Sequence, residues 1–418
     1  MKITTTLMLL ASLTLLTAGC DSPTDPDESG RLEPQRALAV GEQHACVLTE
    51  DGEAYCWGGN GTGQLGNNSI ANSPVPVKVA GGLRFVEIRA GGRHTCALTA
   101  DGDAYCWGAN GVGELGNGRS TPDVVPALVA GGLKFASLGG GGFQHTCART
   151  RDGQVYCWGG DRNGQLGYAT TETCAFGGGT IGCSRTPRQA TLSGSASAVS
   201  AGFLQSCALR SGGVATCWGD NSAGQLGTNA TGTRAAPTDV AGSVRFASLS
   251  GGSLHTCALD SSGRAYCWGD GTVGTLGTGS TAQSLVPAPV SGGLTFRQVS
   301  AASGNSVLGH TCAVAGDGRG YCWGANQLGQ LGVLDAGQTC TSRIGSTVSC
   351  SQAPRAVSGN EQWAAVAAGS HFTCAINTVG TAFCWGSNSA GQLGSGSTAS
   401  SSAVPQPVSG GLRLPRGR

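Results

Sequence analysis

Short stretches of alternating apolar and polar residues recur along the chain, each about the length of one β-strand. Residues 84–88 (RFVEI) alternate with a period of two, which is typical of a half-buried strand. Residues 75–79 contain a proline and suit an edge strand, where a missing N–H is tolerated. Residues 94–98 and 104–107 form a third and a fourth strand, separated by a turn that contains Gly102. The pattern predicts a unit of four short strands.

This unit recurs seven times and is marked by pairs of cysteines with nine residues between them. A Trp-Gly dipeptide follows each second cysteine, and a Gly-x-Leu-Gly motif follows six or seven residues later. The first cysteines of successive units are 50 to 62 residues apart. The pairs are Cys46/Cys56, Cys96/Cys106, Cys147/Cys157, Cys207/Cys217, Cys257/Cys267, Cys312/Cys322 and Cys374/Cys384. Seven four-stranded units predict an all-β, seven-bladed β-propeller over residues 35–411.

The turn in each unit fixes the register of its hairpin. A type I turn followed by a left-handed Gly102 places Cys96 opposite Cys106 at a non-hydrogen-bonded site. Cα atoms at such sites are about 4.5–5.5 Å apart, which suits a disulfide. We therefore predict seven disulfides within hairpins. A His-x-Cys pattern also raises zinc binding, but the spacing of the cysteines does not match a zinc site, and we predict no metal.

The chain begins with features of an exported lipoprotein. Residues 1–19 contain one basic residue and an apolar stretch, which predicts a signal peptide. Residues 16–20 (LTAGC) resemble the lipobox of bacterial lipoproteins, which implies acylation of Cys20, although Thr17 departs from the preferred aliphatic residue. The alternative is ordinary secretion with cleavage nearby. Residues 20–34 are polar and acidic and predict a flexible tether. We expect a lipid-anchored protein of the bacterial cell envelope, on the inner or the outer membrane.

Composition narrows the function classes. The chain has 73 Gly and 15 Pro, which excludes a helical bundle. Only 12% of its residues are charged and the net charge is +1, so no basic surface is available for nucleic acid. Its 19 cysteines favour an oxidising compartment.

Three repeated motifs carry a family resemblance. His94-Thr-Cys-Ala-Leu98, Asp101-Gly-Asp-Ala-Tyr-Cys-Trp-Gly108 and Gly63-Gln-Leu-Gly66 resemble repeats of the regulator of chromosome condensation family. The resemblance covers residues 35–411 and implies a seven-bladed propeller that binds proteins through one face. The cysteines look like those of exported bacterial members. The nuclear guanine-nucleotide exchange activity of the founding member is not expected, because a signal peptide removes the chain from cytosolic GTPases.

The two ends of the repeat region predict how the ring closes. Residues 404–411 copy residues 75–82, and the first unit begins without this strand. We therefore expect the C-terminal strand to complete the first blade, with residues 412–418 as a tail.

Two insertions interrupt the repeat and are the best candidates for a binding surface. One spans residues 168–187 with Cys174 and Cys183, and the other spans residues 333–354 with Cys340 and Cys350. Both follow the same strand of their unit, so both should emerge on one face, each with its own disulfide. Surface decoration is the alternative. The candidate partner-binding residues are Tyr168, Phe176, Arg185, Arg343 and Ile344.

Five of the six histidines share one position of the repeat, and His371 lies one residue before it, which favours a structural role over catalysis. We expect no catalytic residue and no cofactor, and a monomeric, non-enzymatic module that binds another extracytoplasmic protein. The alternatives are a lyase or hydrolase with its site in the central channel, and a carbohydrate-binding module.

Overall fold

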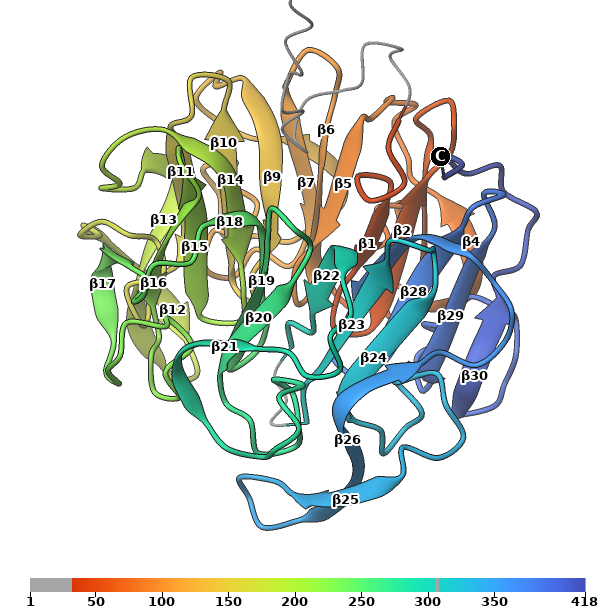
Figure 1. Ribbon diagram of the computed structural model, residues 1–418. Helices are drawn as coiled ribbons and strands as arrows, with labels where there is room; N and C mark the ends of the chain where they lie inside the picture. The colour runs from red at the N-terminus through yellow and green to blue at the C-terminus, as the bar shows by residue number, and fades with distance from the viewer. Residues whose placement is uncertain (1–31, 305–307, 418) are drawn as a thin grey trace, which may run out of the picture.

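Seven β-sheets, which follow one another in chain order, make up the protein (Figure 1). The computed structural model describes residues 32–304 and 308–417. The predicted signal peptide, Cys20 and most of the predicted tether therefore lie outside the described residues. Every regular element in the described ranges is a β-strand, which confirms the all-β prediction. Within these ranges, no helix is long and apolar enough to span a bilayer.

Each sheet is one blade with an inner strand, two middle strands and an outer strand. Five blades have four strands: β1 (Leu38–Val40), β2 (His44–Leu48), β3 (Ala54–Gly58) and β4 (Ser73–Lys78) in blade 1; β5 (Glu87–Ala90), β6 (His94–Leu98), β7 (Ala104–Gly108) and β8 (Asp123–Leu128) in blade 2; β14 (Ala196–Ala201), β15 (Gln205–Arg210), β16 (Val214–Gly219) and β17 (Arg234–Asp239) in blade 4; β18 (Phe246–Gly251), β19 (His255–Asp260), β20 (Ala265–Gly269) and β21 (Ser284–Pro289) in blade 5; β27 (Trp363–Ala368), β28 (Phe372–Asn377), β29 (Ala382–Ser387) and β30 (Ser401–Pro407) in blade 7. Two blades have five: β9 (Phe135–Gly141), β10 (His145–Thr150), β11 (Val155–Gly160), β12 (Glu172–Phe176) and β13 (Gly179–Gln189) in blade 3; β22 (Phe296–Ala301), β23 (His310–Ala315), β24 (Gly320–Ala325), β25 (Gln338–Thr341) and β26 (Thr347–Ala356) in blade 6.

The middle hairpins have the predicted register. In blade 2, Cys96 lies opposite Cys106 and Leu98 lies opposite Ala104. Gly102 has a φ of 82°, a left-handed conformation that glycine adopts without a steric penalty. The turn therefore sets which residues face each other across the hairpin.

Disulfides join the paired cysteines of all seven middle hairpins. These bonds are Cys46–Cys56, Cys96–Cys106, Cys147–Cys157, Cys207–Cys217, Cys257–Cys267, Cys312–Cys322 and Cys374–Cys384. Two further disulfides, Cys174–Cys183 and Cys340–Cys350, lie in the insertions. With their sulfurs in disulfide bonds, these cysteines have no thiolate for a metal.

The spacing across the middle hairpins corrects one detail of the prediction. We expected the Cα atoms of each cysteine pair to be about 4.5–5.5 Å apart. In the seven hairpins they are 4.0–4.1 Å apart. Non-hydrogen-bonded pairs are the closer of the two kinds of antiparallel pair, and the covalent bridge joins residues that already lie directly opposite. The cysteine pairs therefore lie below the short end of the expected range.

The strand order within a blade corrects two predictions. We assigned residues 75–79 to the start of the second unit, but β4 pairs with β3 and is the outer strand of blade 1. Likewise β30 pairs with β29 as the outer strand of blade 7, so the predicted completion of blade 1 by the C-terminal strand is wrong. In both cases the chain turns back onto the strand it has just made, and blade 1 builds all four strands from its own repeat.

Side-chain packing closes the ring between blades 7 and 1. Phe372 of blade 7 lies in one buried apolar cluster with Ala45 and Trp57 of blade 1. The Trp57 indole donates a hydrogen bond to the backbone oxygen of Gln392 in blade 7, at 2.9 Å. Leu414, within the predicted C-terminal tail, is buried in the same cluster.

A tryptophan at the end of each hairpin fills the space between neighbouring blades. All seven indoles are fully buried: Trp57, Trp107, Trp158, Trp218, Trp268, Trp323 and Trp385. Trp107 Nε1 donates to the backbone oxygen of Gln64 in blade 1, at 3.0 Å. Gly66 lies against the same ring, where a Cβ would approach Trp107 Nε1 to 2.7 Å. The repeated Gly-x-Leu-Gly motif is therefore a packing motif between blades.

The outer strand of every blade contains a proline at the same position. This proline directly precedes the residue that pairs with the second hairpin cysteine. The prolines are Pro76, Pro126, Pro187, Pro237, Pro287, Pro354 and Pro405. Because proline has no N–H to donate, these edges resist pairing with a strand from another chain.

Candidate functional site

The hairpin cysteines that we singled out from the sequence lie in the blade cores and contribute to no binding surface. The second cysteine of every middle hairpin has an exposed fraction of 0%: Cys56, Cys106, Cys157, Cys217, Cys267, Cys322 and Cys384. None of these residues lines the central channel described below. They are buried because the middle strands of a blade are covered by the neighbouring blades on both sides of the sheet. Their place is therefore in the scaffold that supports a site, and the site itself must be sought elsewhere.

The apolar clusters show what these cysteines pack against. Cys56 shares a cluster with Trp107 of blade 2, and Cys384 shares one with Trp57 of blade 1. Cys267 and Cys322 lie with the tryptophans of blades 6 and 7 in the same way, whereas Cys217 packs with Leu226 and Val240 of its own repeat. The disulfides thus form part of the apolar core in which adjacent blades meet.

The repeated histidines join neighbouring blades through one kind of hydrogen-bond chain. His44 Nε2 of blade 1 lies 2.9 Å from Thr95 Oγ1 of blade 2. Thr95 Oγ1 donates to the backbone oxygen of Gln64, at 2.9 Å, so it must accept the proton on His44 Nε2. Four equivalent pairs are His94–Thr146, His145–Ser206, His255–Thr311 and His310–Thr373. In blade 4 the amide of Gln205 instead donates to the backbone oxygen of Gly252, at 2.9 Å.

Burial keeps these five imidazoles neutral. Desolvation lowers the pKa of His44, His145 and His310 to about 3, and the pKa of His94 and His255 to about 4. A neutral ring with its proton on Nε2 is the form that the hydroxyl partner requires. These histidines therefore hold blades together, in agreement with the structural role that we predicted.

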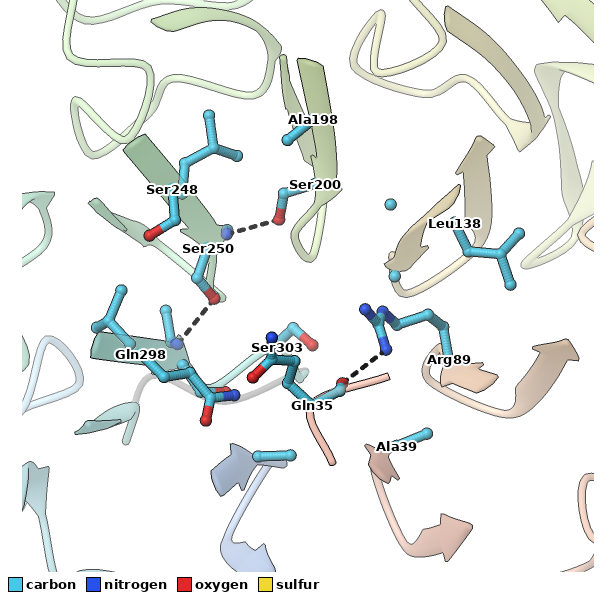
Figure 2. A pocket seen from close by; sticks show the side chains of 18 of the residues that line it. Gln35, Ala39, Arg89, Leu138, Ala198, Ser200, Ser248, Ser250, Gln298 and Ser303 are labelled. Carbon is cyan, nitrogen blue, oxygen red and sulfur yellow. Dashed lines mark hydrogen bonds between the residues drawn. The ribbon is translucent and has the colours of Figure 1, made fainter. Parts of the chain in front are cut away.

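A central channel with a volume of about 300 Å³ lies between the inner strands of all seven blades (Figure 2). Its charged lining residues are Arg36, Glu87, Arg89 and Arg297. Glu87 is 1% exposed and pairs with both Arg36 and Arg89, at 2.9 Å each. A carboxylate held by two guanidinium groups is poorly placed to act as a general base. Among the described residues that line the channel there is no histidine and no second carboxylate, so its geometry offers no support for the lyase or hydrolase alternative.

The two insertions form disulfide-bridged hairpins, β12–β13 in blade 3 and β25–β26 in blade 6. Each follows the third strand of its blade. Because the strands of a blade are antiparallel, both hairpins emerge on the same face of the propeller, as predicted. We call this face, with its loops between third and fourth strands, the hairpin face.

Each disulfide-bridged hairpin packs onto the blade before it. Cys174, Cys183, Phe176 and Ile181 form an apolar cluster with Val112 of blade 2. In the same way, the cysteines of the second hairpin pack with Val273 of blade 5. Val112 and Val273 occupy the same position of the Gly-x-Leu-Gly loop, where blades 1 and 4 carry Thr62 and Ala223. The hairpins are therefore held in place by the fold as well as by their disulfides.

Three of the five predicted partner-binding residues make contacts within the protein. The Tyr168 hydroxyl donates to the backbone oxygen of Cys157 at 2.9 Å, and burial raises its pKa. Phe176 is half-buried in the cluster with Val112. Arg185 pairs with Glu172 at 2.9 Å and donates to Ser120 Oγ at 2.7 Å. The aromatic rings of Tyr168 and Phe176 therefore do not form a free surface for a sugar. The main support for the carbohydrate-binding alternative is lost.

The other two predicted residues lie at the exposed turn of the β25–β26 hairpin. Ile344 is 72% exposed, and Arg343 beside it is exposed too. The charge of Arg343 partly offsets the rise that burial causes in the pKa of Asp270 in blade 5. The sequence analysis did not name Leu334 and Leu328 as candidate binding residues. They lie in the loop before this hairpin and are 83% and 38% exposed. The blade 6 side of the hairpin face thus presents three large apolar side chains to solvent.

Comparison with known families agrees with this architecture. A model of the "Regulator of chromosome condensation (RCC1) repeat" matches residues 51–98, 216–259, 262–314, 317–376 and 379–414, which is more than half of the chain. A second model of the same repeat matches segments in five blades, beginning at residue 36. The chain belongs to the RCC1 repeat family.

Proteins similar to this chain differ widely in length. Human Protein RCC2 is 33% identical over 105 residues, which are 25% of this chain and 17% of RCC2. The human E3 ubiquitin-protein ligase HERC2 is 28% identical over 140 residues, 32% of this chain and 3% of HERC2. The chain thus spans less than a fifth of the length of these two relatives. The crystal structure of Prp20p from Saccharomyces cerevisiae superposes with a TM-score of 0.73 at 20% identity, and the alignment covers 90% of this chain and 88% of Prp20p.

One channel residue, Arg89, departs from the RCC1 repeat, and the sequence analysis did not use this departure. Arg89 stands where equivalent inner strands have Ala39 or Ser250, opposite the first hairpin cysteine. A charged residue at a position otherwise small marks a departure from the repeat. Aligning the seven units strand by strand could have singled it out.

Proposed function

We propose that this RCC1-repeat propeller is a non-enzymatic module that binds another protein outside the cytoplasm through its hairpin face. The observation that carries the proposal is the group of exposed apolar side chains on blade 6, Leu328, Leu334 and Ile344. Large apolar side chains exposed on one face supply contact area for a protein partner. Prp20p, which has this fold, has binding properties to Gsp1p and histones. It is a precedent for protein partners on this fold.

The location is part of the same proposal. Nine disulfides in the described residues favour an oxidising compartment. The signal-like residues 1–19 and the lipobox-like residues 16–20 favour export and attachment through Cys20. A rigid propeller on a lipid-anchored tether would present its hairpin face to a partner in the envelope.

A capture experiment with matched surface variants tests the proposal. The oxidised protein, a Leu328→Ser/Leu334→Ser/Ile344→Ser variant and a Leu128→Ser/Val379→Ser control are used as baits for envelope and secreted proteins. Leu128 and Val379 are 54% and 67% exposed and lie away from the hairpin face, so the control also loses exposed apolar surface. We expect one protein to bind the native and control baits but not the hairpin-face variant. Equal capture by all three baits would place the binding surface elsewhere.

Fractionation of the same cells tests the anchor. The native chain should sediment with membranes, and a Cys20→Ala variant should not. Sedimentation of both would argue against lipid attachment at this residue.

A further inference from the structure

One position of the inner strands decides the chemistry of the central channel. It is the position opposite the first hairpin cysteine, and its side chain faces the channel. Blades 4, 5 and 6 place Ser200, Ser250 and Ser300 there, whereas blade 2 places Arg89. Figure 2 shows Ser200 and Ser250 on the wall across the channel from Arg89.

The hydroxyl groups of the three serines are free to donate hydrogen bonds. Each Oγ accepts a hydrogen bond from a backbone N–H of the next blade, at 2.9 Å for Ser200 and 3.0 Å for Ser250 and Ser300. These bonds use the oxygen as an acceptor and leave its O–H as a donor. No contact within the described residues uses those three protons as donors. They remain available to a molecule in the channel.

The channel also carries an excess of positive charge. Its lining includes three arginines, Arg36, Arg89 and Arg297, and one carboxylate, Glu87. Arg36 and Arg89 share that carboxylate, one on each oxygen. Arg297 donates to a backbone partner, the oxygen of Trp363, and no carboxylate of the described residues neutralises its charge. Burial lowers the pKa of Arg89 and Arg297, as expected for cations that are only partly compensated.

Two of the acceptor side chains in the lining, Gln298 and Glu87, are already occupied. Both ends of the Gln298 amide are bound to the backbone of Val366, at 2.9 Å and 3.0 Å. Both oxygens of Glu87 are held by arginines. A channel with free hydroxyl donors and excess positive charge selects against cations and favours an anion that accepts hydrogen bonds.

We propose that the central channel binds a small oxyanion, a carboxylate or phosphate group, between the Arg89 guanidinium and the hydroxyls of Ser200, Ser250 and Ser300. A cavity of about 300 Å³ is large enough for such a group together with a small organic molecule that carries it. This site is separate from the hairpin face and does not depend on protein binding there.

Titration with inorganic phosphate and with acetate, at constant ionic strength maintained with chloride, tests the site. Binding is measured by calorimetry on the intact oxidised protein and on three variants. Arg89→Gln removes the charge, and Ser250→Ala removes one hydroxyl donor. Arg84→Gln is the matched control, because Arg84 is 57% exposed and pairs with Glu53 away from the channel. Circular dichroism verifies that each variant is folded.

We expect at least one of the two anions to bind the native protein. Arg89→Gln should weaken that binding at least about tenfold, since one charge-assisted hydrogen bond is lost, and Arg84→Gln should change it less than about twofold. Ser250→Ala should weaken it several-fold without a change in charge. Crystals grown with selenate should show the anomalous selenium peak beside Arg89. Absence of binding by both anions, equal affinity of the two arginine variants, or a selenium peak outside the channel would each overturn the proposal.

Discussion

At the scale of single residues, the joints between blades depend on neutral buried side chains. The Gln64 amide oxygen accepts a hydrogen bond from the backbone N–H of Thr62, at 3.0 Å, within the Gly-x-Leu-Gly loop. Blade 2 has Glu114 at this position, 4% exposed, which accepts the equivalent bond from Val112 at 2.9 Å. Burial raises the pKa of Glu114 to about 7. A carboxyl thus stands where five of the other six blades use an amide, and where blade 5 has Thr275.

We predict that Glu114→Gln stabilises the protein in a pH-dependent way. The folded state keeps the Glu114 proton up to about pH 7, whereas the unfolded chain releases it near pH 4.5. Folding stability is therefore lost as pH rises between these values, by up to about 3 kcal/mol. Glutamine removes this loss, so the gain in unfolding free energy should be largest above pH 7 and vanish near pH 4.5.

Urea unfolding across this pH range measures the effect. The buried histidines, with lowered pKa values, cost stability at acid pH in both proteins and cancel in the comparison. Gln64→Glu, the reverse change in blade 1, should lose stability as pH rises. A gain from Glu114→Gln that is the same at pH 4.5 and pH 8 would contradict the argument.

At the scale of elements, disulfides serve two kinds of hairpin. Cys96 and Cys106 join β6 and β7 in the middle of a blade, where both are buried. Cys174 and Cys183 join β12 and β13 at the edge of a blade, and their cluster contacts the preceding blade through Val112. The loops closed by the two disulfides are nearly equal in length, with separations of 10 and 9 residues. Their effects should differ because only the first hairpin belongs to a blade core.

We predict that Cys96→Ala/Cys106→Ala lowers the free energy of global unfolding by about 2–3 kcal/mol, the chain-entropy value for such a loop. Cys174→Ala/Cys183→Ala should lower it by less than about 1 kcal/mol, since β12–β13 can open locally. Hydrogen exchange should then be faster in residues 172–183 alone. Equal losses in global stability, measured by denaturant unfolding, would show that the inserted hairpin unfolds together with the blades.

At the scale of the whole molecule, the ring closes at a joint that differs from the rest. Five joints use a histidine of one blade and a hydroxyl of the next, and the joint after blade 4 uses Gln205. Between blades 7 and 1 both polar partners are replaced, because Phe372 stands in place of the histidine and Ala45 in place of the hydroxyl residue. The Trp57 indole still donates to Gln392 across this joint. The closing joint is therefore apolar at the position where the others are polar.

We predict strong coupling between Phe372→His and Ala45→Thr. The first change alone should cost about 2–4 kcal/mol, because it leaves a buried imidazole N–H without an acceptor and removes apolar packing. Adding the second change supplies the hydroxyl and should recover at least about 1 kcal/mol. A double-mutant cycle in urea measures the coupling, with His94→Phe/Thr146→Ala as the reciprocal change at an ordinary joint. Additive effects at the closing joint would contradict a direct pairing of these two positions.

The sequence by itself determined the repeat, the number of blades, the hairpin register and the cysteine pairs. Each of these depends on contacts between residues close in the chain, such as Cys96 and Cys106 across a turn at Gly102. Local spacing fixes such contacts before any tertiary packing is known.

Only the tertiary structure decided how the units join. The sequence pattern is the same whether an outer strand such as Ser73–Lys78 pairs with the preceding or the following hairpin. In the structure β4 pairs with β3, which belongs to the preceding hairpin. The same holds for Tyr168, whose hydroxyl bonds to the backbone of its own blade, and for Arg89, which lines the channel together with serines of other blades. These arrangements depend on how strands and blades pack together, which the spacing of residues within one repeat does not specify.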